Sequence, residues 1–234
     1  MPGTVNAASS WVWGASGKHP VVKDYITIGG TPIMSGLSRW MEEGYRRVGR
    51  KTTSCSWRFF GRGPRMGDVA CGLIRDSSDG AGRPFPLLIM GQGRLDGWEK
   101  VWEQLPRVLD DLWMRMEFLC SRRVFDLEEL KRDIRSFPVP VLPGEHGRAA
   151  GTGVEFPVPS GKEGFFSFAL TGADLQDEAV RLLTALKDHV QPVPEAVFAG
   201  GSLDESFLVA FARPLVVRDF ETLWTMTDRD SGRP

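Results

Sequence analysis

The order of apolar and polar residues predicts short strands between helices in the first half of the chain. Apolar and polar residues alternate over 24–28, as in a strand with one buried face. Strands at 69–74 and 85–90 should form an antiparallel hairpin, because turn-forming residues fill 75–83. Pro84 and Pro86 lack an N–H group, so the second of these strands should start at an edge or outside the ladder. The strands predicted in this half are 11–16, 24–28, 55–60, 69–74 and 85–90, with a loop at 17–20.

Helical periodicity marks three further segments of the same half. An apolar stripe with helical spacing runs over 32–49. A wider stripe covers 96–122, and Pro106 should divide it into two helices, the second starting at this proline. Asp126 is expected to cap another helix, because Glu129 follows three residues later in the capping-box position.

A segment rich in proline and glycine at 138–162 separates two predicted units. The N-terminal α/β domain covers 1–137, and a smaller C-terminal α/β subdomain covers 163–234. The fold class expected is α/β (α+β), with a central, mostly antiparallel sheet flanked by helices. The elements predicted in the C-terminal unit are strands at 165–170, 196–199 and 207–212, a helix capped by Asp174, and a final helix at 219–226.

Composition narrows the classes of partner and location. The chain has 29 basic and 30 acidic residues, so its net charge of -1 provides no general attraction for nucleic acid or an anionic membrane. Residues 1–10 lack the basic and apolar regions of a signal peptide, and no apolar run approaches the roughly 20 residues that span a bilayer. These features favour a cytoplasmic protein without membrane insertion.

The chain carries no recognised catalytic, cofactor or metal pattern. Its three cysteines form no C-x-x-C pair, and its three histidines lie far apart. Gly17-Lys18 lacks the remaining residues of a phosphate-binding loop, and 76–80 lacks the final glutamate of a calcium loop. Ser202 lacks the second glycine of a nucleophile elbow. We therefore expect a binding protein rather than an enzyme, with no catalytic residue, cofactor or metal.

Three short stretches combine polar or turn-forming residues with aromatic ones. They are Gly17-Lys18-His19-Pro20 with Asp24-Tyr25, then Trp57-Arg58-Phe59, and then Gly82-Arg83-Pro84-Phe85-Pro86. One interpretation is structural, with Lys18 or Arg58 paired with Asp24 or Asp76. A rival interpretation is an unrecognised active site around Lys18, His19, Asp24, Arg58 and Asp76, to which a dyad of His19 with Cys55 or Cys71 also belongs.

These stretches resemble the TagF family, also called ImpM, which is associated with bacterial type VI secretion. The family pattern Gly-Lys-x-Pro-x-x-Gly-Asp-Phe is matched by 17–25, except that Lys23 replaces a glycine and Tyr25 a phenylalanine. The Trp-Arg-Phe strand is matched at 57–59, and the Gly-Arg-aromatic-Phe-Pro-Leu hairpin at 82–87, with Pro84 in place of the aromatic residue. A weaker likeness covers 196–223, where Ala199 replaces a frequent aromatic residue.

The resemblance implies a fold, a function and a partner. It implies a longin- or profilin-like N-terminal layer and a cytosolic, post-translational negative regulator of type VI secretion. It also implies that the regulator binds a forkhead-associated (FHA) scaffold protein of the apparatus. A structural accessory subunit of that apparatus is the remaining alternative. The candidate partner-binding residues are Gly17, Lys18, Pro20, Asp24, Trp57, Arg58, Asp76, Gly82, Arg83, Phe85 and Pro86.

Overall fold

The computed structural model describes residues 11–48, 53–122, 124–143 and 164–226. The N-terminal residues 1–10, the predicted helix end at 49 and most of the predicted linker at 138–162 lie outside the described residues.

An eight-stranded sheet forms the middle layer, with the order β2-β1-β5-β4-β3-β7-β8-β6. Every neighbouring pair of its strands is antiparallel. The predicted fold class, a central antiparallel sheet flanked by helices, is therefore confirmed. The strands are β1 (Val12–Lys18), β2 (Tyr25–Ile28), β3 (Ser56–Arg62), β4 (Asp68–Arg75), β5 (Leu87–Arg94), β6 (Phe165–Leu170), β7 (Ala196–Gly201) and β8 (Ser206–Phe211).

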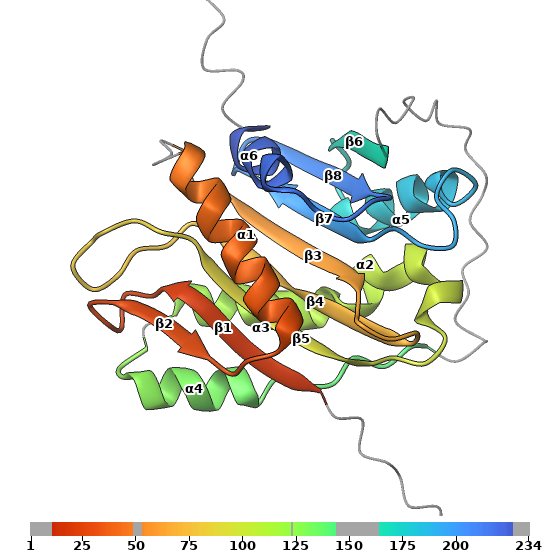
Figure 1. Ribbon diagram of the computed structural model, residues 1–234. Coiled ribbons are helices and arrows are strands. Elements are labelled where there is room, and N and C mark those ends of the chain that lie inside the picture. The colour runs from red at the N-terminus through yellow and green to blue at the C-terminus, as the bar shows by residue number, and fades with distance from the viewer. Residues whose placement is uncertain (1–10, 49–52, 123, 144–163, 227–234) are drawn as a thin grey trace, which may run out of the picture.

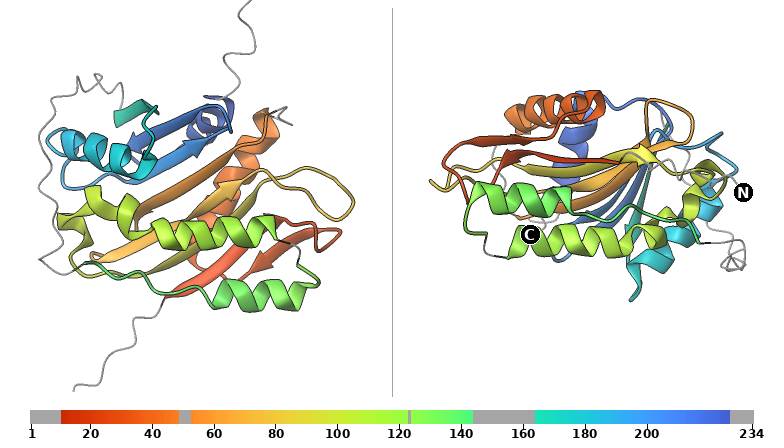
Figure 2. Two further views of the ribbon diagram at one scale, coloured as in Figure 1. Left: turned by 180° about the vertical axis from the view of Figure 1, so that it is seen from behind. Right: turned by 90° about the horizontal axis from the view of Figure 1, so that it is seen from below.

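Helices cover both faces of the sheet, as the view from below shows (Figure 2). Helices α1 and α6 lie on one face, and α2 to α5 lie on the other (Figure 1). The α helices are α1 (Pro32–Val48), α2 (Leu105–Val108), α3 (Asp110–Ser121), α4 (Leu127–Arg135), α5 (Leu175–Leu186) and α6 (Val217–Thr225), and two 3-10 turns are η1 (Trp98–Lys100) and η2 (Trp102–Gln104).

Two hydrophobic cores follow from the alternation of side chains along the strands. On β3, Trp57 and Phe59 enter the core beneath α1 and α6, whereas Phe60 enters the opposite core. Tryptophans anchor both cores: Trp57 and Trp224 are 1% exposed on one side, and Trp98, Trp102 and Trp113 are at most 1% exposed on the other. Burial of these large rings contributes much of the stabilising free energy of the fold.

The predicted units meet in the middle of the sheet. Strand β3, from the first unit, pairs with β7, from the second, in a register that sets Arg58 opposite Ala199. Gly200 permits this close pairing, because an added Cβ there would lie 2.1 Å from the Ser56 carbonyl oxygen. The domain boundaries at 137 and 163 stay a prediction, while the sheet itself is continuous across both units.

The predicted loop beginning at Gly17 is wrong, because β1 continues through Gly17 and Lys18. Gly17 pairs with Ile26 on one side and Leu87 on the other. Its φ of 126° and its lack of a side chain allow this, since a Cβ would lie 2.1 Å from the Pro86 carbonyl oxygen. Pro86 itself precedes β5, so the expectation that a proline-containing start lies outside the ladder is confirmed.

The predicted helix before Pro106 is also wrong, because 98–104 forms two 3-10 turns. Gly97 has a left-handed φ of 84°, and Val101, at φ -132°, separates the turns. The later part of this stretch is helical as expected, but α2 begins at Leu105 and α3 follows only at Asp110.

Both predicted helix caps are confirmed. The Asp126 carboxylate accepts the Glu129 N–H at 2.8 Å, and the Asp174 carboxylate accepts two N–H groups in the first turn of α5. In α6 the acid predicted to start the helix, Asp219, is the third residue of its first turn and accepts the Val216 N–H at 2.7 Å.

Candidate functional site

A buried carboxylate joins two of the loops that the sequence singles out. Asp79, in the β4–β5 loop, has a side chain with 0% exposure and lies 3.1 Å from the Lys18 ammonium and 2.7 Å from Arg83 Nε. The Asp79 carboxylate also accepts the N–H groups of Ala81, at 3.0 Å, and Arg83, at 2.9 Å. We call this cluster, with the loops 19–24 and 76–86 that it connects, the Asp79 junction.

Further contacts fasten the two loops of the Asp79 junction to each other. Gly80 donates its N–H to the Val22 carbonyl oxygen at 2.6 Å, and the Arg83 guanidinium donates to the Lys23 carbonyl oxygen. The ring of Phe85 contacts the ring of Tyr25 at 5.5 Å between centroids. In Figure 1 the β4–β5 loop reaches past the sheet beside the β1–β2 turn.

The electrostatics of the Asp79 junction favour the charged carboxylate. Removal from water raises the pKa of Asp79, but the hydrogen bonds from Arg83 and Ala81 and the ammonium of Lys18 outweigh this and hold the pKa far below its ordinary value. Asp79 therefore stays ionised throughout the neutral range. Each of its interactions joins segments distant in sequence or closes the loop on itself, so the arrangement is structural.

His19 lies in the same region in a neutral, structural role. Its ring is 5% exposed, and its Nδ1 accepts the Val21 N–H at 3.1 Å. Burial lowers the pKa of His19, which favours the neutral ring, and the hydrogen bond that Nδ1 accepts places the ring proton on Nε2. His19 borders a cavity of about 380 Å³ together with Cys120, rather than with Cys55 or Cys71 as the predicted dyad requires. Burial raises the pKa of Cys120 to about 11, so its thiol stays protonated.

Arg58, on β3, forms a second ion-pair cluster with two acids of α3. Its Nε and Nη2 donate to the two carboxylate oxygens of Glu117, each at 2.8 Å, and its Nη1 donates to Asp110 at 2.9 Å. Its guanidinium also lies 5.8 Å from the ring centre of Trp113. Burial lowers the pKa of Arg58, but the hydrogen bonds and charges of Glu117 and Asp110 raise it by more. The pKa of Arg58 is therefore above its ordinary value, and the guanidinium stays protonated.

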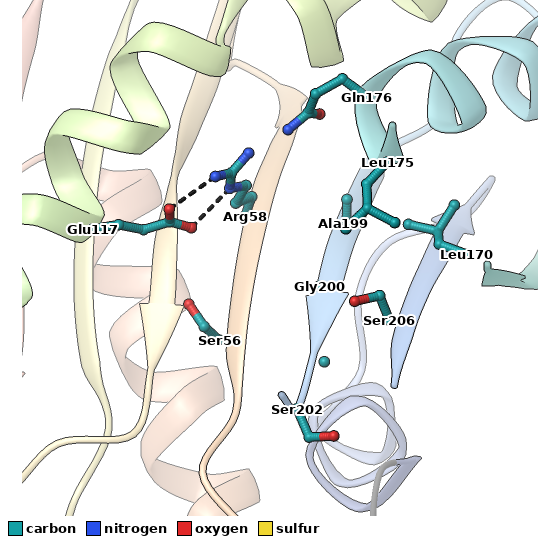
Figure 3. A pocket seen from close by; sticks show the side chains of 11 residues that line it. Ser56, Arg58, Glu117, Leu170, Leu175, Gln176, Ala199, Gly200, Ser202 and Ser206 are labelled. Carbon is teal, nitrogen blue, oxygen red and sulfur yellow. Dashed lines mark hydrogen bonds and ion pairs between the residues drawn. The ribbon is translucent and has the colours of Figure 1, made fainter. Parts of the chain in front are cut away.

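A cavity of about 250 Å³ opens beside Arg58 between α3 and α5 (Figure 3). Its floor is the β3–β7 pairing, where Gly200 and Gly201 contribute backbone without side chains. We call this cavity the Arg58 groove. Its lining residues are Ser56, Arg58, Glu117, Leu170, Leu175, Gln176, Ala199, Gly200, Gly201, Ser202 and Ser206.

The remaining candidate residues are scattered. Asp24 is exposed and accepts the N–H of its neighbour Tyr25 at 2.8 Å. Asp76 accepts the Cys55 N–H at 3.2 Å. Trp57 is buried in a core, and Gly82, at φ 76°, lies on an exposed turn with no neighbouring atom within 4 Å of an added Cβ.

The ion-pair partners predicted for Lys18 and Arg58 are wrong. Lys18 pairs with Asp79, and Arg58 pairs with Glu117 and Asp110. Asp24 is nearer to Lys18 in sequence than Asp79 is, and Asp76 is nearer to Arg58 than Asp110 or Glu117. The β4–β5 loop nevertheless brings Asp79 to Lys18, and α3 packs over β3 so that its two acids reach Arg58. These partners follow from the crossing of elements that are distant in sequence. The cluster of acidic and basic residues in the turn 75–83 is the sequence signal that points toward Asp79.

Within the described ranges, no three His, Cys, Asp or Glu side chains are arranged to hold a metal ion. The helices described also include none with the length and apolar character needed to cross a membrane.

The fold and these clusters define a three-layer α/β/α protein with an all-antiparallel sheet. No protein-family profile and no curated protein matches the chain. The crystal structure of PA0076 from Pseudomonas aeruginosa PAO1 is similar, with a TM-score of 0.55 over 90% of this chain and 93% of that chain. The two sequences are 19% identical, so the similarity establishes a shared fold.

Proposed function

We propose that this protein acts in the bacterial cytoplasm by binding other proteins, as a TagF/ImpM-type negative regulator of type VI secretion. Its proposed partner is the FHA-domain scaffold of the apparatus. The proposed contact surface is the exposed side of the Asp79 junction, which includes Pro20, Lys23, Asp24, Ala81 and Gly82.

The observation that carries this proposal is the way Asp79 fixes two exposed loops. Lys18, Asp79 and Arg83 lock the loops 19–24 and 76–86 together from beneath. A surface held in one conformation loses less conformational entropy when a partner binds. Two of these three residues belong to the stretches that resemble the TagF family, which supports a shared architecture for this surface.

The arrangement of the charged groups favours binding over catalysis. Lys18 lies against Asp79, whereas Arg58 lies against Glu117 and Asp110, on another element. The rival active site needs Lys18, His19, Asp24 and Arg58 to converge on one reacting atom. His19 is instead a buried hydrogen-bond acceptor for its own turn, and Asp24 bonds its own neighbour.

A pull-down with the purified FHA scaffold protein of the same bacterium tests the proposal. The wild-type chain is expected to retain the scaffold, and Lys23→Glu is expected to weaken retention at least fivefold, because this exposed side chain lies on the junction surface. Arg132→Glu is the matched control, a charge reversal at an exposed residue of α4. Loss of retention in the control alone, or no retention by wild type, would contradict the proposal.

Deletion of the gene provides the cellular test. A repressor predicts increased type VI secretion in the deletion strain, and complementation with wild type should restore the lower level. Unchanged secretion would contradict a regulatory role. Constant stoichiometry with the assembled apparatus would instead favour the structural-subunit alternative.

A further inference from the structure

We propose that the Arg58 groove binds one basic side chain, an arginine or lysine, from a polypeptide partner that flanks it with apolar residues. This site is separate from the Asp79 junction, and the inference does not depend on the type VI assignment.

The size of the groove suits a single side chain. Its volume of about 250 Å³ lies just below the range of roughly 300–1,000 Å³ typical of small-molecule pockets. The floor is open because Gly200 and Gly201 have no side chains there. The backbone admits no replacement, since a Cβ on Gly200 would lie 2.1 Å from the Ser56 carbonyl oxygen.

The ion pairs beside the groove contain one more carboxylate than guanidinium. Two carboxylates, Glu117 and Asp110, pair with one guanidinium, that of Arg58, so these three ion-paired groups carry a formal charge of -1. The neighbouring cation on β4, Arg75, donates to Ser121 at 3.4 Å. The neighbouring polar residue from α5 is Gln176, which is neutral and donates to Asp110 at 2.8 Å. A cation entering the groove would bring the cluster to neutrality.

The two carboxylates keep capacity for further hydrogen bonds. Their side chains are 31% and 33% exposed, for Asp110 and Glu117 respectively. A carboxylate offers about four acceptor positions, and the three bonds from Arg58 with the one from Gln176 use only half of those on the pair. The Ser56 hydroxyl at the edge of the groove is buried and lacks a hydrogen-bond partner in the described part of the chain. An arginine or lysine supplies donors to such acceptors.

Exposed apolar side chains border the groove on both sides. On α3, Met114 is 47% exposed and occupies the same helical stripe as Asp110 and Glu117, at spacings of four and three residues. On the other side, Leu175 is 40% exposed and lines the groove, and Leu203 is 99% exposed next to the lining residue Ser202. Apolar groups around a charged centre match a basic residue between apolar neighbours.

An anion is the wrong ligand for this groove. Arg58 is the cation that could attract one, and its guanidinium already makes three short hydrogen bonds to carboxylates. An incoming anion would also face the uncompensated charge of Asp110 and Glu117 at close range.

Fluorescence anisotropy with a labelled, amidated leucine–alanine–arginine–alanine–leucine peptide tests the inference. The full chain should bind this peptide with a dissociation constant on the order of 100 µM to 1 mM, and a peptide with glutamate in place of arginine should bind at least tenfold more weakly. Equal binding of the two peptides, or no binding at millimolar protein, would overturn the inference.

Variants locate the binding site. Asp110→Asn removes the excess charge but keeps the two bonds between Arg58 and Glu117, and should weaken binding about fivefold. Leu175→Ala should weaken it about twofold to threefold, because an exposed apolar neighbour is lost. Glu42→Gln, which removes one exposed acid on the opposite face of the sheet, should bind as wild type does.

Lys23→Glu separates this inference from the proposed function. Because Lys23 belongs to the Asp79 junction, the variant should bind the arginine peptide normally even where the FHA scaffold is no longer retained. Unchanged peptide affinity in both Asp110→Asn and Leu175→Ala would place the peptide elsewhere and overturn the inference, while scaffold retention would still decide the proposed function.

Discussion

The Asp79 junction and the Arg58 groove are both built from ion pairs between distant parts of the chain, but they differ in how much of the acid remains accessible. Asp79 has 0% side-chain exposure, and its oxygens accept from two cations and two backbone N–H groups. Asp110 and Glu117 are each about one-third exposed beside a cavity. The saturated acid holds two loops together, whereas the partly exposed acids keep acceptor positions that a ligand could use.

Asp79→Asn should cause a larger loss of stability than substitutions at Gly200, Arg58 or Glu42. It leaves Lys18 and Arg83 without their buried counter-charge, and both loops of the Asp79 junction lose their common anchor. Urea unfolding measures the loss, and hydrogen exchange should show it concentrated at 76–86. Wild-type protection of that loop in the variant would contradict the anchoring role.

The effect of Asp79→Asn should depend on pH in a defined direction. The folded-state pKa of Asp79 is lowered, so its contribution is complete above the unfolded value of about 3.9 and is lost as the pH falls below it. The difference in unfolding free energy between wild type and variant should therefore be constant between about pH 5 and 7 and shrink at lower pH. A difference that grows on acidification would contradict this electrostatic account.

Gly200→Ala should destabilise the protein by about 3 kcal/mol, because it adds a strained backbone conformation to a steric clash. The φ of Gly200 is 151°, and the new Cβ would lie 2.1 Å from the Ser56 carbonyl oxygen. Gly82→Ala is the matched control at the Asp79 junction, where φ is 76° but the surrounding space is empty. It should cost about 1 to 2 kcal/mol. Equal unfolding midpoints in urea for Gly200→Ala and Gly82→Ala would show that β3 and β7 leave room for a Cβ at position 200.

Arg58→Lys should cost about 1 kcal/mol, because a single ammonium cannot reproduce the forked contacts with Glu117 and Asp110. The stacking of the guanidinium near Trp113 is lost as well. Thermal unfolding measures the change. An unchanged midpoint would mean that hydrogen bonds from water stabilise the two carboxylates as well as those from Arg58 do.

Glu42→Gln provides the smallest expected effect. Glu42 and Arg46 are 53% and 68% exposed and lie one helical turn apart, so their pair should contribute less than about 0.5 kcal/mol. A larger change in urea unfolding would show that exposed pairs matter as much as the two clusters.

Local patterns predict most elements of the fold, since periodicity, caps and turn residues act over a few positions. The stripe of α1 and the caps Asp126 and Asp174 are examples. Such local patterns do not predict the order of the strands in the sheet. The pairing of β3 with β7, for example, joins Trp57 to Gly200, which lie more than 130 positions apart in the sequence. The apolar stripe before Pro106 predicts an α-helix, but the backbone conformations of Gly97 and Val101 divide this segment into two 3-10 turns.

The candidate sites are predictable only in part. The sequence marks Lys18, Arg58 and Arg83 as unusual, but it does not reveal their acidic partners, because α3 and the β4–β5 loop bring those acids across the sheet. A sequence pattern marks a charged residue that needs a partner, while tertiary packing selects which acid it receives.

Hydrogen exchange of the full chain, with and without the purified FHA scaffold protein, tests the central claim most directly. We expect new protection at 19–24 and 76–86, the two loops of the Asp79 junction, with little change along α1 and α6. Retention of the scaffold without added protection in either loop would contradict the claim that the Asp79 junction is the docking surface.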